Sequence, residues 1–216
     1  MKYKAVLFDF DYTLGDATES IVAGYAYGLT QLGWPEPSKE AVQKTIGYLL
    51  EDGYTMLTGD TDAAHKKQFK ALFREKAHPI QVKTTTLFPG ALQLMKALQQ
   101  AGVPTAVVST KHSATLHAVL EHTGIMPYLA FAIGSDDVSK PKPDPEGITA
   151  ALHRLHIEPQ NALYCGDTVL DAEAANRANC GFCAVLNGTT PEAAFAAWPH
   201  AHICPDLPSL QAWLGL

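Results

Sequence analysis

The stretch Lys4-Ala-Val-Leu-Phe-Asp-Phe-Asp-Tyr-Thr-Leu14 is an apolar run that ends in two carboxylates, Asp9 and Asp11. Residues 5–10 are predicted to form a buried strand, in which both carboxylates share one face with Cα atoms roughly 6 to 7 Å apart. Like charges this close in an apolar wall are costly unless a cation or a proton offsets them. The stretch therefore predicts a hard-metal site or a protonated carboxylate that serves as an acid, unless it is only a strand ending in a polar turn.

Composition narrows the class of protein. The chain has 216 residues, 47% hydrophobic and 18% charged, which is typical of a globular protein with one sizeable core. The net charge of −6 and the scattered lysines and arginines give no basic face for nucleic acid. No apolar run approaches the about 18 residues of a membrane span, and the run before Asp9 is too short for a signal peptide. We therefore expect a cytoplasmic protein that binds neither membrane nor nucleic acid.

The pair Cys180-Gly-Phe-Cys183 has the spacing of a dithiol redox motif. A reactive pair needs its first cysteine at a helix N-terminus, where the helix dipole lowers the thiol pKa, but this pair follows a helical stretch. Cys165 and Cys204 are isolated in the sequence and do not complete a zinc site. We expect four reduced thiols without a redox or metal role.

Most of the chain alternates between short β-type runs and helical stretches. This alternation predicts an α/β fold, a Rossmann-like parallel sheet with helices on both faces. The expected strands are residues 5–10, 105–109, 130–133, 162–165, 182–186 and 202–203, and the expected helices are residues 91–101, 113–123, 145–155, 171–178 and 191–197.

One segment interrupts the alternation. Residues 15–85 contain no convincing strand and only helical stretches, at residues 19–32, 39–50 and 61–77. Seventy residues of helix after the first strand are too long for one crossover, so we interpret residues 15–85 as an inserted helical cap. Residues 1–14 and 86–216 would then form the α/β catalytic core, with the cap above the two aspartates.

Three more polar side chains follow expected strands or open helices. Ser109 ends one strand, Asp167 ends another in Gly-Asp-Thr, and Lys142 stands between two prolines before a helix. Carboxyl ends of parallel strands meet at one crevice, so Asp9, Asp11, Ser109, Lys142 and Asp167 are predicted to converge there. Each also has a simpler interpretation alone, such as a helix cap for Ser109 or a surface lysine for Lys142.

These groups suit phosphoryl transfer through an aspartyl-phosphate. Attack of Asp9 on phosphorus requires the charge of the phosphate to be offset, which a divalent cation and a lysine would do. Mg²⁺ prefers oxygen ligands, and Asp11 could give a proton to the leaving oxygen. Ser109 and nearby amides could hold phosphate oxygens.

Four motifs give the chain a resemblance to the haloacid dehalogenase-like superfamily of hydrolases. Asp9-Phe-Asp-Tyr-Thr13 resembles the first motif, Ser109 the second, Lys142 the third, and Gly166-Asp-Thr-Val-Leu-Asp171 the fourth. The order of the motifs and the helical insertion after the first also match, so the resemblance covers essentially the whole chain.

The resemblance implies roles for the acidic residues. Asp9 would be the nucleophile and a Mg²⁺ ligand, and Asp11 the acid and base, with its backbone carbonyl on the metal. Asp167 would be the remaining ligand, whereas Asp171 would bind metal more weakly or orient Lys142 or a metal-bound water. Asp11 also favours a phosphatase over a dehalogenase, because breaking a carbon–halogen bond needs no proton on the leaving group.

The motif-three lysine has two candidates, Lys140 and Lys142, because Lys140-Pro-Lys-Pro also fits the pattern. We prefer Lys142, since Lys142-Pro-Asp-Pro-Glu146 more closely resembles the phosphoglycolate phosphatase and pyrophosphatase branch. An inactive Lys140→Ala variant beside an active Lys142→Ala variant would reverse this choice.

The substrate is less constrained by the sequence. Ser109, Thr110 and Lys111 resemble the phosphate-binding segment of the same branch. Tyr12 stands where many relatives have glycine, and it is either a harmless variant or part of the substrate pocket. These residues indicate a small phosphorylated metabolite. The cap residues Tyr48, Lys66, Lys67 and Arg74 could line the site, but we favour the interpretation in which they face water, as lysines of amphipathic helices normally do. A sugar phosphomutase or a catalytically idle binding protein remains an alternative, as does a monomer or a homodimer.

Overall fold

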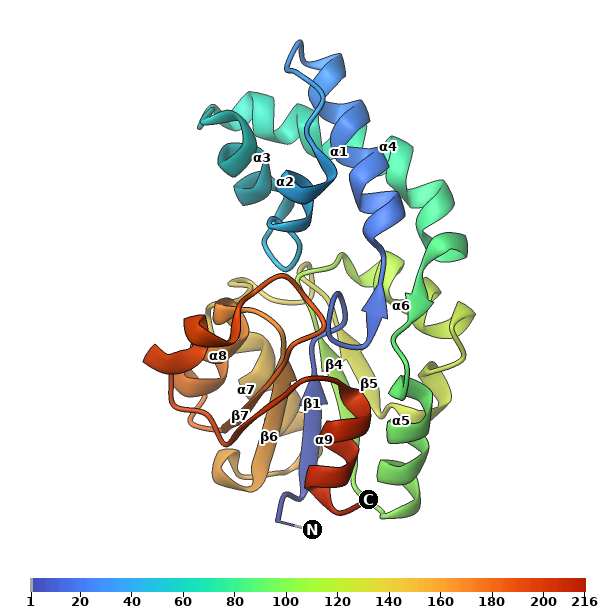
Figure 1. The fold of residues 1–216 in the computed structure, drawn as a ribbon, viewed down its shortest axis with the longest axis vertical. Helices are drawn as coiled ribbons and strands as arrows, with labels where there is room; N and C mark the ends of the chain where they lie inside the picture. Colours follow the sequence, from blue (N-terminus) through green and yellow to red (C-terminus); the bar gives the residue numbers. More distant parts are fainter. Residues whose placement is uncertain (1) are drawn as a thin grey trace.

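Residues 2–216 are described by the computed structural model, which contains a six-stranded parallel sheet. The strand order is β5-β4-β1-β6-β7-β8, with every neighbouring pair parallel (Figure 1). The predicted α/β fold is thus confirmed. The strands are β1 (Ala5–Phe8), β4 (Thr105–Val108), β5 (Phe131–Ile133), β6 (Ala162–Gly166), β7 (Gly181–Val185) and β8 (His202–Cys204).

Helices cover both faces of the sheet and bury two apolar clusters. Val6 and Phe8 of β1 point to one cluster and Leu7 to the other, as the period of two in a strand requires. The first cluster packs under α5 (Ala91–Gln100), α6 (Ser113–His122) and α9 (Leu207–Leu214), and the second under α7 (Glu146–Leu155) and α8 (Val169–Arg177). Short 3-10 helices follow at Met126–Tyr128, Pro159–Asn161 and Glu192–Ala197.

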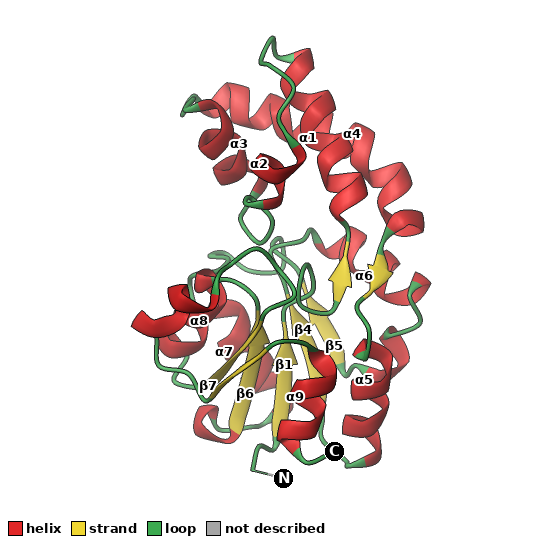
Figure 2. Cartoon of the chain, viewed as in Figure 1, coloured by secondary structure: helices red, strands yellow, loops and turns green. Residues whose placement is uncertain are grey.

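Four helices stand above the carboxyl edge of the sheet (Figure 2). They are α1 (Thr18–Gln31), α2 (Lys39–Gln43), α3 (Leu50–Thr58) and α4 (Ala63–Thr84), and they enclose an aromatic core of their own. Gly24 and Gly28 let α1 approach α4 closely, because a Cβ there would lie 2.7 Å from the Phe73 ring and 2.9 Å from the Phe69 ring. We keep the division into a core and a cap of residues 15–85 as a prediction, and use the word cap for these helices.

The connections between cap and core differ from the expected ones. A two-residue antiparallel pair, β2 (Gly15–Asp16) with β3 (Thr86–Leu87), joins the base of the cap and is too short to leave a periodic pattern in the sequence. The helix expected at residues 39–50 is interrupted, since α2 ends at Gln43 and α3 begins at Leu50, and Gly47 between them adopts a φ of 95°. That turn brings the Gly47 carbonyl to Thr110 Oγ1, 3.1 Å away, so the cap reaches the core at this point.

The core differs from the sequence-based expectations at two places near the end of the chain. The helix expected at residues 191–197 is a 3-10 helix, and α9 was not predicted. The Asp206 side chain caps α9 by accepting a hydrogen bond from the Ser209 amide at 2.8 Å, so a local signal was present. Among the helices of residues 2–216, none combines the length and apolar character that crossing a membrane requires.

Candidate active site

The polar side chains expected at the carboxyl edge of the sheet come together there. Asp9 follows β1, Ser109 follows β4, and Asp167 follows β6, while Lys142 arrives from the segment before α7. All four are at most 7% exposed. Figure 2 shows the loops after these strands gathered beneath the cap. The predicted convergence of these residues is therefore present in the structure.

Lys142 is the centre of a buried charge network. Its Nζ atom lies 2.8 Å from Asp9 Oδ1 and 2.6 Å from Asp171 Oδ1, and it donates a hydrogen bond to the Tyr164 hydroxyl at 3.0 Å. Burial lowers the pKa of Lys142, but the carboxylates of Asp171 and Asp9 outweigh burial and hold that pKa above its usual range. Lys142 is therefore charged. The Lys140 side chain is exposed, and its backbone N–H donates to Glu146.

Asp171 is bound on both of its oxygens. Oδ1 meets Lys142, and Oδ2 accepts hydrogen bonds from the Thr168 amide at 2.9 Å and the Thr168 hydroxyl at 2.6 Å. Thr168 and Asp171 form the capping box that begins α8. Because its oxygens are engaged in this way, Asp171 is placed to orient Lys142.

Three buried carboxylate oxygens accept no hydrogen bond from residues 2–216, namely both oxygens of Asp9 and Asp11 Oδ1. Asp9 Oδ1 is in the ion pair with Lys142, so Asp9 Oδ2 and Asp11 Oδ1 are the two without a protein partner. One oxygen each of Asp9, Asp167 and Asp171 lies within 4.8 Å of the others. Burial raises the pKa of Asp9 to about 6 against the lowering influence of Lys142, and burial together with Asp171 and Asp9 raises the pKa of Asp167 well above its usual range.

This arrangement fits a hard divalent cation. The donor set consists of oxygen, and the carboxylates repel one another, so a cation would offset an unfavourable charge. Asp9 and Asp167 each offer a carboxylate, whereas Asp171 is already held by Lys142 and Thr168. The predicted set of Asp9, the backbone carbonyl of Asp11, and Asp167 therefore remains our preferred set for Mg²⁺.

Asp167 is held by residues that the sequence analysis did not select. The Thr13 hydroxyl donates to Asp167 Oδ1 at 3.2 Å, and Asn187 Nδ2 donates to the Thr13 carbonyl at 3.1 Å. A Cβ on Gly188 would lie only 2.1 Å from Asp167 Oδ2. The dipeptide Asn187-Gly188 directly follows the strand expected at residues 182–186. Because ligand sites lie at the carboxyl ends of parallel strands, this position in the sequence could have identified the two residues as part of the site.

We expect Gly188→Ala to weaken metal binding, because its methyl group would displace the Asp167 carboxylate. Partners that orient a ligand typically contribute about 10- to 100-fold in metal affinity, so we expect a loss of that size for Mg²⁺. Titration calorimetry on the metal-free variant measures it. Thr189→Ala, an exposed change in the same loop, is the matched control. Unchanged affinity in Gly188→Ala would contradict the placement of Asp167.

Lys111 forms another buried ion pair in the site, in addition to the two that Lys142 makes. Its Nζ atom lies 3.0 Å from Asp11 Oδ2, with side-chain exposures of 6% and 10%. Its backbone amide donates to Ser109 Oγ at 3.3 Å, and Thr110 donates to the Gly47 carbonyl of the cap. The segment 109–111 thus connects the two aspartates after β1 with the cap.

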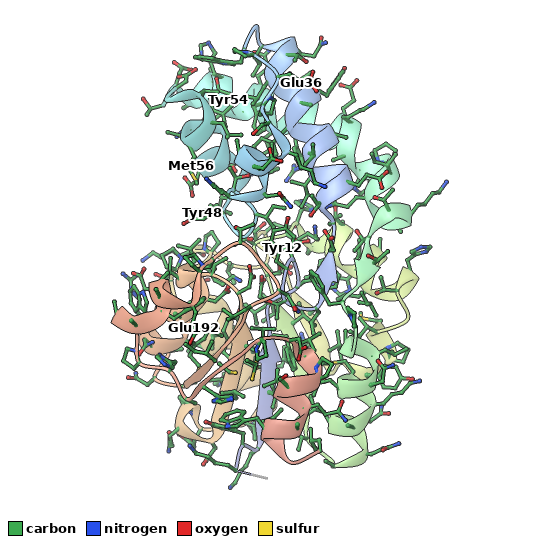
Figure 3. The ribbon with its side chains drawn as sticks, viewed as in Figure 1. Tyr12, Glu36, Tyr48, Tyr54, Met56 and Glu192 are labelled. Atoms are coloured by element: carbon green, nitrogen blue, oxygen red, sulfur yellow. The ribbon has the colours of Figure 1, made fainter. Side chains whose placement is uncertain are left out.

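Tyr12 connects the core to the cap through hydrogen bonds of its side chain. Its φ is 61°, in the left-handed region that favours glycine. The hydroxyl lies 2.8 Å from Thr18 Oγ1 and accepts a hydrogen bond from Gln43 Nε2 at 3.0 Å. Figure 3 places Tyr12 at the top of the core, below the cap residue Tyr48. A role in substrate binding stays a prediction for Tyr12, which is not among the residues that line the main cavity.

The main cavity has a volume of about 450 Å³ and opens between cap and core. Asp11, Thr110 and Lys111 line it from the core. Of the four cap residues considered from the sequence, Tyr48 and Arg74 line it, and Lys66 and Lys67 do not. The structure adds Lys70, His78 and Gln81 of α4 to the lining.

The four cysteines are free thiols. Cys183 Sγ lies 3.7 Å from Cys204 Sγ inside the core. Burial raises the pKa of the Cys180 thiol to about 12, so this thiol stays protonated and is a poor nucleophile at neutral pH.

Comparison with known proteins relates residues 6–185 to the family model described as haloacid dehalogenase-like hydrolase. "Probable phosphatase IndB" of Dickeya dadantii is 32% identical over 80% of this chain and 76% of its own length. "Pyrophosphatase PpaX" of Bacillus velezensis is 30% identical, covering 81% and 79%, and "Phosphoglycolate phosphatase" of Escherichia coli K12 is 29% identical, covering 82% and 79%. A crystal structure from Bacteroides fragilis, assigned to the haloacid dehalogenase-like hydrolases, has a TM-score of 0.94 at 34% identity and covers 97% of this chain and 100% of its own.

Proposed function

Because the chain belongs to the haloacid dehalogenase-like hydrolases and is similar to their phosphatases, we propose that it is a Mg²⁺-dependent phosphatase of a small phosphorylated metabolite, working through an aspartyl-phosphate. Phosphoglycolate and pyrophosphate are the first candidate substrates, since relatives carry those names. The observation that carries the proposal is the Asp9 carboxylate. Lys142 holds its Oδ1 at 2.8 Å, and its buried Oδ2 has no hydrogen bond to residues 2–216.

The first half of the reaction uses Asp9 as nucleophile. Lys142 orients the carboxylate and, with Asp171 behind it, keeps a positive charge beside the attacked phosphate. The bound Mg²⁺, held by Asp9, the Asp11 carbonyl and Asp167, would supply positive charge that offsets the phosphate oxygens. Ser109 and the amides after it are placed to hold the oxygens that gain charge.

Asp11 handles the proton in both halves. Lys111 holds its Oδ2 at 3.0 Å, and Oδ1 accepts no hydrogen bond from residues 2–216. When the Asp9 carboxylate forms its bond to phosphorus, the bond to the leaving oxygen breaks, and that oxygen takes a proton from Asp11. Water then attacks the aspartyl-phosphate, gives its proton to Asp11, and releases phosphate and the Asp9 carboxylate.

A phosphate-release panel with and without EDTA tests the proposal. We expect Mg²⁺-dependent release of inorganic phosphate from an aryl phosphate and from small phosphate esters, and at least about 100-fold less release in EDTA because the acidic cluster then lacks its counter-charge. Full activity in EDTA would contradict the metal requirement. Isomerised product without free phosphate, dependent on a bisphosphate activator, would indicate a phosphomutase. The cytoplasmic location and the oligomeric state stay predictions.

A further inference from the structure

The cavity between cap and core has room for more than a glycolate or a second phosphate. Its volume of about 450 Å³ lies within the roughly 300–1,000 Å³ of pockets that hold drug-sized ligands. The core side of the cavity is lined by Asp11 and Lys111. A phosphate held at Asp9 would therefore direct its leaving group past Asp11 and into this space.

One wall of the cavity consists of apolar side chains that are held in place by packing. Ile21 and Tyr25 of α1, Ile46, and Phe73 of α4 line it. These four side chains are at most 7% exposed and belong to the aromatic core of the cap, so they are fixed by packing. An apolar group placed against this wall leaves water, which favours its binding.

The two lysines in the cavity wall are each paired with an acid. Three cations line the cavity, Lys70, Arg74 and Lys111, beside three acids, Glu51, Glu75 and Asp11. Lys70 pairs with Glu51, and Lys111 pairs with Asp11 at 3.0 Å, whereas Arg74 has no ion pair within residues 2–216. His78 and His112 also line the cavity. A carboxylate or phosphate in the leaving group would have to compete with Glu51 and Asp11 for the two lysines.

Gln81 adds a neutral polar group to the wall. It lies on α4 and is 5% exposed, and its backbone carbonyl accepts a hydrogen bond from Thr85 Oγ1 at 2.6 Å. Within residues 2–216 its side-chain amide has no hydrogen-bond partner, and it faces the cavity. Because the amide carries no charge, it adds nothing to the charge of the cavity wall.

We propose that the leaving group of the substrate is uncharged and apolar, a ring or a branched chain larger than glycolate, seated against Ile21, Tyr25, Ile46 and Phe73. This inference rests on the proposed phosphatase activity, because it names the substrate class of the same site. The phosphate ester bond breaks as described above, and the released alcohol takes its proton from Asp11. Phosphoglycolate and pyrophosphate, the first candidates by the names of relatives, are then poorer substrates than such an ester.

Three phosphates that share similar chemistry test the inference in the Mg²⁺-loaded protein: ethyl phosphate, phosphoglycolate and 2-phenylethyl phosphate. All three leave as primary alcohols, so differences in kcat/KM report on the leaving-group pocket. Burying a phenyl ring should raise kcat/KM by about 10- to 100-fold over the other two. A ratio of one or less would overturn the inference and leave the phosphatase proposal intact. No phosphate from any ester, including an aryl phosphate, would overturn the phosphatase proposal itself.

A cavity-filling variant connects the preference to this pocket. Ala114 of α6 is exposed and lines the cavity, so Ala114→Leu should fold normally and narrow the space. We expect the preference for 2-phenylethyl over ethyl phosphate to fall at least about 5-fold, because the ring loses part of its buried contact. Ala71→Leu is the matched control, an exposed position on α4 that does not line the cavity. An unchanged preference in Ala114→Leu would place the ring elsewhere and overturn the inference.

Discussion

Asp9→Asn is expected to lower phosphate release at least about 10⁴-fold, since loss of a catalytic nucleophile removes most of the rate enhancement of a covalent mechanism. The amide keeps the size of the carboxylate but cannot form the aspartyl-phosphate. Release of phosphate from an aryl phosphate under single-turnover conditions measures the loss. Asp52→Asn, an exposed change on α3, should stay within about twofold of the unsubstituted protein. Full activity in Asp9→Asn would contradict the mechanism.

The same variant should make the stability of the metal-free protein less dependent on pH. Burial raises the pKa of Asp9 to about 6 from an unfolded value near 3.8, so the folded state holds a proton that the unfolded state has lost between these pH values. The free energy of unfolding of the metal-free protein therefore decreases as pH rises through this window, and the decrease is complete above the folded pKa.

Thermal unfolding in EDTA measures this effect. Between pH 4 and pH 7.5 the Tm of the unsubstituted protein should fall by several degrees more than that of Asp9→Asn, because one buried titrating carboxylate is gone. A residual decrease is expected from Asp167, whose pKa is also raised. If the Tm of both proteins fell by the same amount over this pH range, the result would contradict a raised pKa for Asp9 in the metal-free protein.

The parts of the fold that could be predicted from the sequence are those with a short-range signal. Strand β1 and strand β4 are buried on both faces, so their apolar runs identified them, and the strand-end rule then brought Asp9, Ser109 and Asp167 together. The break at Gly47 was missed, because its φ of 95° serves a contact with Thr168 and Thr110 far along the chain.

Asp171 shows the limit of local patterns in the site. Thr168 and Asp171 form a capping box, which depends only on residues close together in the chain. The second oxygen of Asp171 binds Lys142, 29 residues earlier in the chain, and no local pattern contains that pairing. The sequence therefore left metal binding and lysine orientation open for Asp171, and the contacts favour orientation.

Lys142→Ala and Lys140→Ala should differ strongly. Lys142 is buried between Asp9 and Asp171, and removing one partner of a buried ion pair typically costs about 3–5 kcal/mol in the free energy of unfolding. We expect that loss in urea unfolding and at least about 10³-fold lower phosphatase activity, since the Asp9 carboxylate also loses the group that orients it. Lys140 has an exposed side chain, and its replacement should change either quantity little.

A second substitution separates the structural role of Lys142 from its role in the reaction. Lys142→Met keeps much of the side-chain volume, and Lys142→Met with Asp171→Asn removes both members of one buried ion pair. Removing both charges leaves fewer unpaired groups than removing one, so the double variant should recover part of the stability that Lys142→Met loses. Activity should remain low in both, because neither presents a cation to the Asp9 carboxylate and the phosphate. If the double variant regained activity together with stability, Lys142 would act only in folding, and the motif-three role would pass to another residue, with Lys140 tested first.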